Sequence, residues 1–299
     1  METHGLAFTA IKATDADSYD RRAREFDDLT VRFSTDIAAH MLRLAGLSSE
    51  GSLLDLGTGT GLLAILAAKQ CNTVVAVDHS AGMLAEARAS ADRAGLSSQI
   101  SFEAMDAEAL KLAPGTFDAV VSLFVIRHLP NPTLAVQEIF RVLKPGGRAV
   151  ISTGARPDLM TRQGLGAAFE IAYDRIMEKA GRKALSPTFL RRFLAEQGVP
   201  ASNHHAAHAA TGDVGQMLKA AGFAQVRRDW WTERHELTPE LFWEVQAVFD
   251  SEARTALSAL PADDTERLRE SFLKRVRQLA DRGATLVYRT GVFIYTARK

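Results

Sequence analysis

The segment from Ser52 to Ala68, SLLDLGTGTGLLAILAA, constrains the fold most strongly. It opens with an apolar run, which predicts a buried strand. Gly57, Gly59 and Gly61 follow at alternate positions, where the missing Cβ lets the backbone turn tightly and approach a ligand. The apolar residues after Gly61 predict a helix whose first N–H groups have no partner within the helix. This order of strand, turn and helix indicates a site for a nucleotide-bearing cofactor.

The spacing of these glycines distinguishes two classes of nucleotide-binding protein. Nicotinamide-dependent dehydrogenases carry G-x-G-x-x-G at this place, whereas the third glycine here comes one residue earlier. The stretch from Asp55 to Gly61 reads D-x-G-x-G-x-G, with an acidic residue at the end of the first predicted strand. It resembles the first motif of the class I S-adenosylmethionine-dependent methyltransferases. A dehydrogenase is kept as an alternative that the spacing disfavours.

Two further carboxylates follow predicted strands. The run Val74–Asp78, VVAVD, predicts a second strand, and its terminal carboxylate is placed to accept hydrogen bonds from both ribose hydroxyls of a nucleoside. After a third strand at Ile100–Ala104, the resemblance implies that the Asp106 side chain and the Ala107 backbone N–H bind adenine. The residues expected to bind the cofactor are Asp55, Gly57, Thr58, Gly59, Gly61, Asp78, His79, Met83, Asp106, Ala107 and Leu123.

The next elements arrive in the order that this family has. Phe117–Leu123 predicts a fourth strand, and Phe124–Pro132 is the loop expected to cross the methyl donor. Glu138–Thr153 supplies the end of a helix, a Pro-Gly-Gly turn and a fifth strand. The chain is most similar in these motifs to the ubiquinone and menaquinone biosynthesis C-methyltransferases and related small-molecule enzymes. Where that group has an Arg-Asn pair, this chain has Arg127–His128.

Three residues are candidates for contact with the methyl acceptor. His128 is the candidate general base, because imidazole titrates near neutrality and the residue follows the fourth predicted strand. Arg127 beside it could hold an anionic substrate. Tyr19 shares a predicted helical face with Arg22 and Phe26, in a region that in this family often folds over the cofactor. The alternatives are that His128 only stabilises its loop and that Tyr19 only packs its helix on the domain.

The predicted fold class is α/β, a doubly wound Rossmann-like sheet of seven strands with helical cap insertions. Two helices are expected before the glycine-rich segment, at Ala16–Asp27 and Val31–Gly46. A helix is also expected at Arg162–Ala180, and another from Ser186–Pro187 to Glu196. The predicted domains are an N-terminal helical lid at 1–50, the cofactor-binding core at 51–154, a helical cap at 155–210, and the rest of the sheet at 211–299 with a second helical insertion at about 239–282.

Composition restricts the partners. Lys plus Arg and Asp plus Glu both number 36, so no net charge attracts the chain to nucleic acid or to an anionic membrane. We expect a small-molecule substrate, a cytoplasmic location and no membrane insertion, and we leave a homodimer open. Cys71 is the single cysteine, which excludes an intrachain disulfide. His204, His205 and His208 lack a nearby carboxylate, so no metal site is expected.

The function that the resemblance implies is in-line methyl transfer from S-adenosylmethionine to carbon or oxygen of a small molecule, with S-adenosylhomocysteine as the product. This acceptor would be a natural product or a quinone-like metabolite. The alternative is a protein of the same fold that uses the bound cofactor structurally or for a reaction other than methylation. Methylation of DNA bases is disfavoured, because no Asn-Pro-Pro-Tyr-like motif ends the fourth predicted strand.

Overall fold

The computed structural model describes residues 23–154, 165, 169, 172, 176, 189–199 and 213–299. The chain divides into two compact units, which are described here one at a time. Unit 1 comprises Met1–Gly154, Ala207–Asp229 and Val292–Lys299, and unit 2 comprises Ala155–Ala206 and Trp230–Gly291. The division falls within strands β6 and β7, so that each of these two strands contributes residues to both units.

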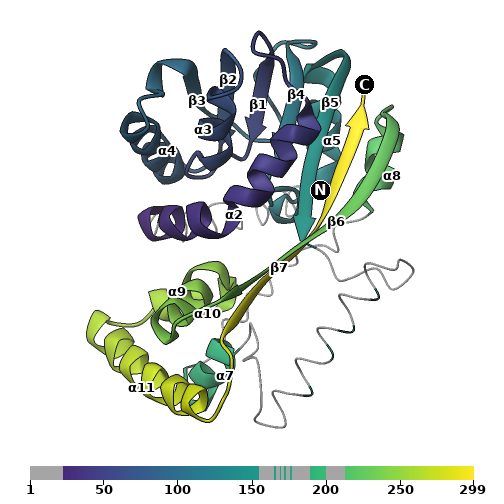
Figure 1. Ribbon diagram of the computed structural model, residues 1–299. Helices are drawn as coiled ribbons and strands as arrows, with labels where there is room; N and C mark the ends of the chain where they lie inside the picture. The colour runs from purple at the N-terminus through teal and green to yellow at the C-terminus, as the bar shows by residue number, and fades with distance from the viewer. Residues whose placement is uncertain are drawn as a thin grey trace, which may run out of the picture. The chain divides into compact units, whose positions relative to one another are not determined.

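The sheet contains seven strands among the described residues, in the order β3-β2-β1-β4-β5-β7-β6 (Figure 1). Neighbouring strands from β3 to β5 pair in parallel, whereas β7 runs antiparallel to β5. The predicted α/β fold with a doubly wound sheet is therefore confirmed. The strand bounds are β1 Ser52–Leu56, β2 Thr73–Asp78, β3 Ile100–Ala104, β4 Phe117–Ser122, β5 Leu143–Gly154, β6 Ala224–Glu236 and β7 Val287–Arg298.

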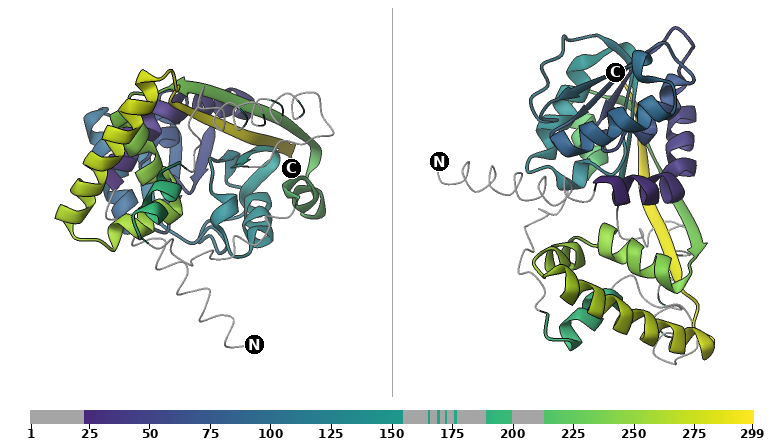
Figure 2. Two further views of the ribbon diagram at one scale, coloured as in Figure 1. Left: turned by 90° about the horizontal axis from the view of Figure 1, so that it is seen from below. Right: turned by 90° about the vertical axis from the view of Figure 1, so that its left-hand side faces the viewer.

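Helices cover both faces of the sheet in unit 1. Helices α2 (Ala23–Ala45), α3 (Leu62–Ala68) and α4 (Ala81–Arg93) contact one another on one face. Helices α5 (Pro132–Val142) and α8 (Val214–Ala220) contact each other on the opposite face, as Figure 2 shows. Parallel strands with helices on both sides bury the sheet, which explains why most residues of β1, β2 and β4 are apolar.

Helix α2 corrects the expectation of two N-terminal helices. One helix runs from Ala23 to Ala45 without a break near residue 30, and nothing is described before residue 23. The chain has no Gly or Pro in this stretch to end a helix. Leu29, Phe33, Ile37 and Met41 recur every fourth residue and are all buried. This continuous apolar stripe packs on the domain and keeps the intervening polar residues helical.

The Pro145–Gly147 segment is also different from the expected turn between a helix and a strand. It lies inside β5, where Phe117 pairs with Leu143 but Ala119 pairs with Arg148. β5 therefore contains three more residues than β4 between these pairs, and they bulge out of the ladder. Gly146 has a φ of 79°, which a residue with a side chain rarely adopts.

Unit 2 contains a helical core of its own. The helices are α7 (Phe189–Glu196), α9 (Pro239–Phe249), α10 (Ser251–Ser258) and α11 (Ala262–Asp281). Phe272 is fully buried, with its ring centre 5.1 Å from that of Trp243 and 5.4 Å from that of Phe193. Of the helix expected at Arg162–Ala180, the structure describes four residues, which are helical and exposed: Leu165, Phe169, Ala172 and Ile176. The domain boundaries given above stay a prediction.

Several smaller features bear on the partners. Cys71 is buried and free. Across the described ranges, no helix is long and apolar enough to cross a membrane, and no group of His, Cys, Asp or Glu could hold a metal ion. The three histidines at 204, 205 and 208 lie outside those ranges.

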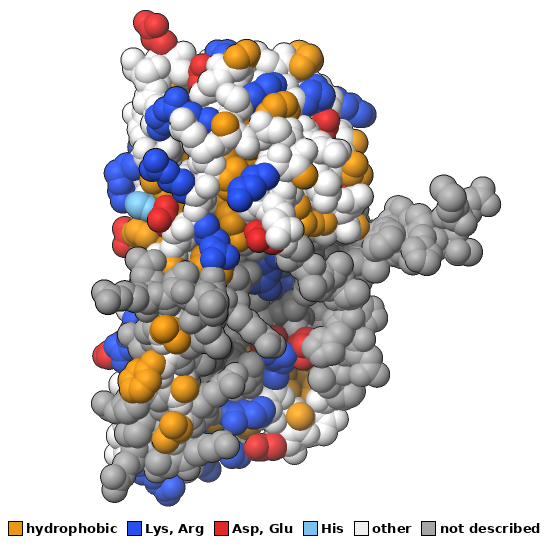
Figure 3. All heavy atoms as spheres, turned by 90° about the vertical axis from the view of Figure 1, so that its right-hand side faces the viewer, with side chains coloured by type: hydrophobic (Ala, Val, Ile, Leu, Met, Phe, Trp, Pro, Cys, Tyr) orange, Lys and Arg blue, Asp and Glu red, His pale blue; other side chains and the backbone are white. Residues whose placement is uncertain are grey.

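On the face of unit 1 that carries α8 and the edge strand β6, Lys and Arg side chains are dispersed rather than gathered (Figure 3).

Candidate functional site

The strand order creates a crevice in unit 1. The chain runs from β1 outward to β3 and then returns to place β4 on the other side of β1. Open α/β sheets bind ligands at such a reversal, outside the carboxyl ends of the strands. The glycine turn follows β1, and the loop containing Arg127 and His128 follows β4. Two of the predicted site segments therefore begin side by side at this edge of the sheet.

The glycine turn has the backbone conformation that its residues predict. Gly57, Gly59 and Gly61 have φ angles of 73°, 55° and 90°, in the left-handed region that favours glycine. The N–H groups of Gly57 and Thr58 donate to the Val77 carbonyl, at 2.8 and 2.9 Å. Gly61 is the N-cap of α3. The turn is therefore anchored to β2, and the start of α3 faces the crevice.

Asp78 at the end of β2 is held by backbone donors. The Gly59 N–H donates to its Oδ2 at 2.9 Å, and the Ser80 N–H donates to its Oδ1 at 3.0 Å. His79 Nδ1 lies 3.3 Å from Oδ1. Ser80 in turn caps α4, because its Oγ accepts from the Met83 N–H at 3.0 Å. Each carboxylate oxygen has two lone pairs, so Asp78 retains capacity for two further donors.

Asp55 is buried beside the turn, with a relative exposure of 1%. Its Oδ2 accepts a hydrogen bond from Thr58 Oγ1 at 2.7 Å, and it also accepts one from the Ala64 backbone. Burial raises the pKa of Asp55 from 3.8 to about 7, against the opposing effect of these two hydrogen bonds. The negative charge of Asp78 adds to the increase. A carboxyl group with a pKa this strongly perturbed is typical of a functional site.

The turn leaves room for a ligand above Gly59. A Cβ added at Gly57 would lie 2.2 Å from Val125, and one at Gly61 would lie 3.1 Å from Ala87. A Cβ added at Gly59 would have no heavy atom of the described residues within 4 Å, apart from those of Gly59 itself and its two chain neighbours. The neighbouring Thr60 hydroxyl is buried and has no hydrogen-bond partner among those residues. Open space beside a hydrogen-bonded carboxylate fits a nucleoside that reaches Asp78.

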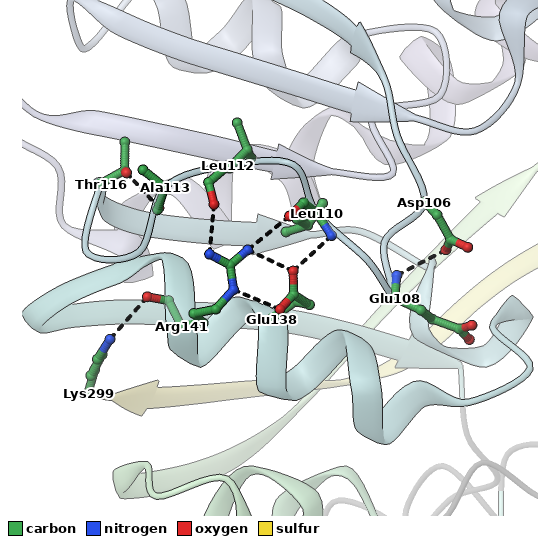
Figure 4. A network of polar contacts seen from close by, with 9 residues as sticks. All are labelled: Asp106, Glu108, Leu110, Leu112, Ala113, Thr116, Glu138, Arg141 and Lys299. Carbon is green, nitrogen blue, oxygen red and sulfur yellow. Dashed lines mark hydrogen bonds and ion pairs between the residues drawn. The ribbon is translucent and has the colours of Figure 1, made fainter.

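A network of polar contacts holds the loop after β3 (Figure 4). Glu138 accepts the Leu110 N–H at 2.8 Å and pairs with Arg141, which lowers the pKa of Glu138. Arg141 donates to the carbonyls of Leu112 and Leu110 at 2.7 and 3.0 Å. These bonds anchor α5 to the segment just beyond the expected adenine contacts. The Asp106 side chain at the start of this loop is exposed, and Ala107 is buried.

The loop after β4 carries the remaining candidates. Leu123 and His128 are half-buried and Arg127 is exposed. Arg127 and His128 belong to the short 3-10 helix η2 (Ile126–His128). The contact between this loop and the glycine turn is made by Val125, whose side chain lies against Gly57. Met83 is buried in α4, and Tyr19 lies outside the described residues.

Comparison with known proteins identifies this part of the chain. Residues 54–151, which run from β1 into β5, match a family model described as a methyltransferase domain. They form a class I S-adenosylmethionine-dependent methyltransferase domain. S-adenosylmethionine is the cofactor of this class. In this methyltransferase domain, the glycine turn lies at the crevice between β1 and β4.

Relatives of this methyltransferase domain act on different atoms. A ubiquinone/menaquinone biosynthesis C-methyltransferase of Geobacter sulfurreducens is 38% identical over 113 residues, covering 37% of this chain and 44% of that protein. A ubiquinone biosynthesis O-methyltransferase of Dinoroseobacter shibae is 34% identical over 148 residues, covering 49% of this chain and 59% of that protein. The chain thus spans about half the length of these curated relatives.

A solved structure supports the fold. A protein of Bacillus halodurans, described as a putative methyltransferase, has a TM-score of 0.54 and 21% sequence identity, and the match covers 88% of this chain and 98% of that one. At this identity the likeness concerns the fold alone.

Contacts between distant segments of the methyltransferase domain were not foreseen from sequence. The Ser152 hydroxyl accepts the Phe124 N–H, and Glu138 and Arg141 hold the loop after β3. The spacing of Glu138 and Arg141 on one helix indicates an ion pair. It does not indicate that the pair binds a loop nearly thirty residues earlier in the chain.

The open space above Gly59 gives a testable prediction. Gly59→Ala is expected to weaken binding of S-adenosylhomocysteine at least tenfold, because the new methyl group occupies the ligand's place and 1.4 kcal/mol is a factor of ten. Gly95→Ala is the matched control, since Gly95 also has a positive φ, 70°, and open space around it, but lies at the end of α4. Both variants are expected to lose similar stability. Equal affinities in isothermal titration calorimetry would contradict the placement.

Proposed function

We propose that the chain is a methyltransferase that transfers the methyl group of S-adenosylmethionine to a small-molecule acceptor. The observation that carries the proposal is the geometry of Asp78. Its carboxylate ends β2, accepts the N–H of Gly59 in the glycine turn, and retains lone pairs toward the open space there. A carboxylate in this position suits the two hydroxyls of a ribose.

The other cofactor contacts follow from the same crevice. Asp106 and the Ala107 N–H, in the loop held by Glu138 and Arg141, are proposed to bind adenine. Asp55 and Thr58 are proposed to bind the methionine end of the cofactor, together with the backbone of the glycine turn. His79, Met83 and Leu123 complete the proposed set. When bound, S-adenosylmethionine supplies an electrophilic methyl group on a positively charged sulfur.

The chain's own contribution is to position the acceptor and to accept a proton. The bound cofactor would supply the methyl carbon to the acceptor's carbon or oxygen, and its sulfur would leave as a neutral thioether that keeps the electron pair of the methyl–sulfur bond. An imidazole nitrogen of His128 is proposed to take the acceptor's proton, and Arg127 to bind an anionic group of the acceptor. Positioning alone can supply several kcal/mol, up to about 7 to 11 in well-oriented models.

These two roles predict different kinetic effects. His128→Gln is expected to lower kcat by about 100-fold or more, the usual contribution of a general base, with little change in KM. Arg127→Gln is expected to raise the KM for the acceptor and leave kcat nearly unchanged. The measurement is steady-state kinetics across pH. If His128→Gln turns over normally at every pH while Arg127→Gln does not, His128 is not the base.

The acceptor is proposed to be a natural product or a quinone-like metabolite. One relative is a C-methyltransferase and another is an O-methyltransferase, which supports either carbon or oxygen as the acceptor atom. The Arg-His pair in place of Arg-Asn distinguishes this chain from the quinone group. Three other expectations remain predictions: contact between Tyr19 and the acceptor, a homodimer, and the absence of a nucleic-acid partner.

The experiment is product analysis with S-adenosylmethionine carrying a deuterated methyl group. The protein is incubated with panels of phenols, catechols and quinols, and the products are analysed by mass spectrometry. A product that carries the deuterated methyl group, together with S-adenosylhomocysteine, supports the proposal. A changed acceptor without the label identifies the alternative, in which the cofactor serves a reaction other than methylation.

A further inference from the structure

Phe124, the second residue after β4, has a backbone conformation that its side chain disfavours. Its φ is 64°, in the left-handed region where a bulky residue is a genuine outlier. Gln225 is the other non-glycine residue with positive φ among those the structure describes, and it lies at the start of β6. Backbone outliers of this kind gather at functional sites, where the surrounding structure must stabilise them.

Ser152 supplies the stabilising contact. Its Oγ accepts a hydrogen bond from the Phe124 N–H at 3.0 Å, and its side chain is fully buried in β5. The position of Ser152 is fixed, because β5 is paired with β4 on one side and with Ile294 of β7 on the other. The hydroxyl therefore belongs to a rigid part of the sheet, whereas the N–H that it binds belongs to a loop.

The conformation at Phe124 sets the direction of the residues that follow. Val125 comes next and lies against Gly57, where an added Cβ would be 2.2 Å from its Cγ2. Ile126 is fully buried, and the His128 N–H donates to the Val125 carbonyl at 2.8 Å. A change of φ at Phe124 would move Val125 off the glycine turn and redirect η2, which carries Arg127 and His128.

We propose that Ser152 is a positioning residue for the reaction. By holding Phe124 in the left-handed conformation, its hydroxyl keeps Val125 against the glycine turn and η2 at the crevice. This role rests on the proposed function, because the turn and η2 carry the proposed contacts to cofactor and acceptor. Ser152 acts through the backbone of Phe124 and does not touch the ligand itself.

The first test compares two buried serines, with S-adenosylhomocysteine as the probe. Ser152→Ala is expected to weaken its binding about tenfold, the effect of one lost hydrogen bond that leaves a buried N–H unpaired. Ser90→Ala is the control, because buried Ser90 loses a hydrogen bond to Asp27 at the α2–α4 contact instead. The Ser90→Ala variant should bind S-adenosylhomocysteine with the same affinity as the unchanged protein. Unchanged affinity in Ser152→Ala would overturn the proposal.

The second test separates the backbone of Phe124 from its ring. Both Phe124→Gly and Phe124→Ala remove the ring, but only glycine adopts the left-handed conformation without cost. The double variant with Ser152→Ala and Phe124→Gly is expected to bind S-adenosylhomocysteine several-fold more tightly than the double variant with Ser152→Ala and Phe124→Ala. Equal affinities of the two double variants would show that backbone conformation at residue 124 does not matter.

A third measurement does not depend on the ligand. Amide hydrogen exchange in the segment 123–128 is expected to be faster in Ser152→Ala and slower again when Phe124→Gly is added. If the unchanged protein does not bind S-adenosylhomocysteine, the proposed function fails, and this exchange pattern still tests the role of Ser152. Exchange that is the same in all three proteins would overturn that role.

Discussion

Replacing Asp78 by alanine is expected to weaken binding of S-adenosylhomocysteine by roughly 100-fold or more. Two hydrogen bonds from ribose hydroxyls to a carboxylate are lost, each worth about 1.5–3 kcal/mol. The substitution also leaves the N–H groups of Gly59 and Ser80 without their acceptor, which loosens the glycine turn. Asp78→Asn keeps one acceptor oxygen and should show an intermediate loss.

Asp118 provides the control for this experiment. It lies near the amino end of β4, away from the crevice, where it accepts hydrogen bonds from Ser52 and pairs with Lys144. The bond from Lys144 is the main cause that lowers the pKa of Asp118 to about 2. Asp118→Ala is expected to leave the affinity unchanged in calorimetry. Equal losses in Asp78→Ala and Asp118→Ala would mean that Asp78 acts through the fold and not through the ligand.

The second large effect is a dependence of stability on pH that originates at Asp55. The pKa of Asp55 has its ordinary value of 3.8 in the unfolded chain, and burial raises it to about 7 in the folded protein. Between these values the folded protein binds a proton that the unfolded chain does not, so the free energy of unfolding falls as pH rises. At about 1.4 kcal/mol per unit, the loss between pH 4 and pH 8 reaches about 4 kcal/mol.

Asp55→Asn removes this titration and keeps the size of the side chain. We compare the free energy of unfolding of the variant with that of the unchanged protein at each pH. This difference is expected to shift in favour of the variant by about 4 kcal/mol between pH 4 and pH 8. Urea unfolding of both proteins without ligand, at several pH values, measures the difference. Parallel pH profiles would contradict a raised pKa at Asp55. The variant should also bind S-adenosylhomocysteine less tightly, because the proposed contact between Asp55 and the methionine end of the cofactor loses its negative charge.

The sequence was sufficient where local pattern decides the structure. The alternate glycines predicted the turn after β1, because the φ angles found at Gly57, Gly59 and Gly61 lie in the region that favours glycine. Serine is a preferred N-cap residue, and the Ser80 hydroxyl at the start of α4 does accept the Met83 N–H. Strands β2 to β4 begin and end within one residue of their predicted bounds.

Other features depend on contacts between distant positions. Nothing near Ser152 in the sequence indicates that its hydroxyl meets Phe124, twenty-eight residues earlier. The bulge at Pro145–Gly147 depends on pairing with β4, and the single helix α2 depends on packing of its apolar stripe. The pKa of Asp55 was not foreseen either, because burial is its main cause and the sequence does not report burial directly.

The most direct test is calorimetric titration of the protein with S-adenosylmethionine, S-adenosylhomocysteine and NAD. We predict that the first two bind with micromolar dissociation constants, that NAD does not bind, and that Asp78→Ala loses the binding. Binding of NAD in their place, or of none of the three ligands, would contradict the assignment of the crevice between β1 and β4 to S-adenosylmethionine.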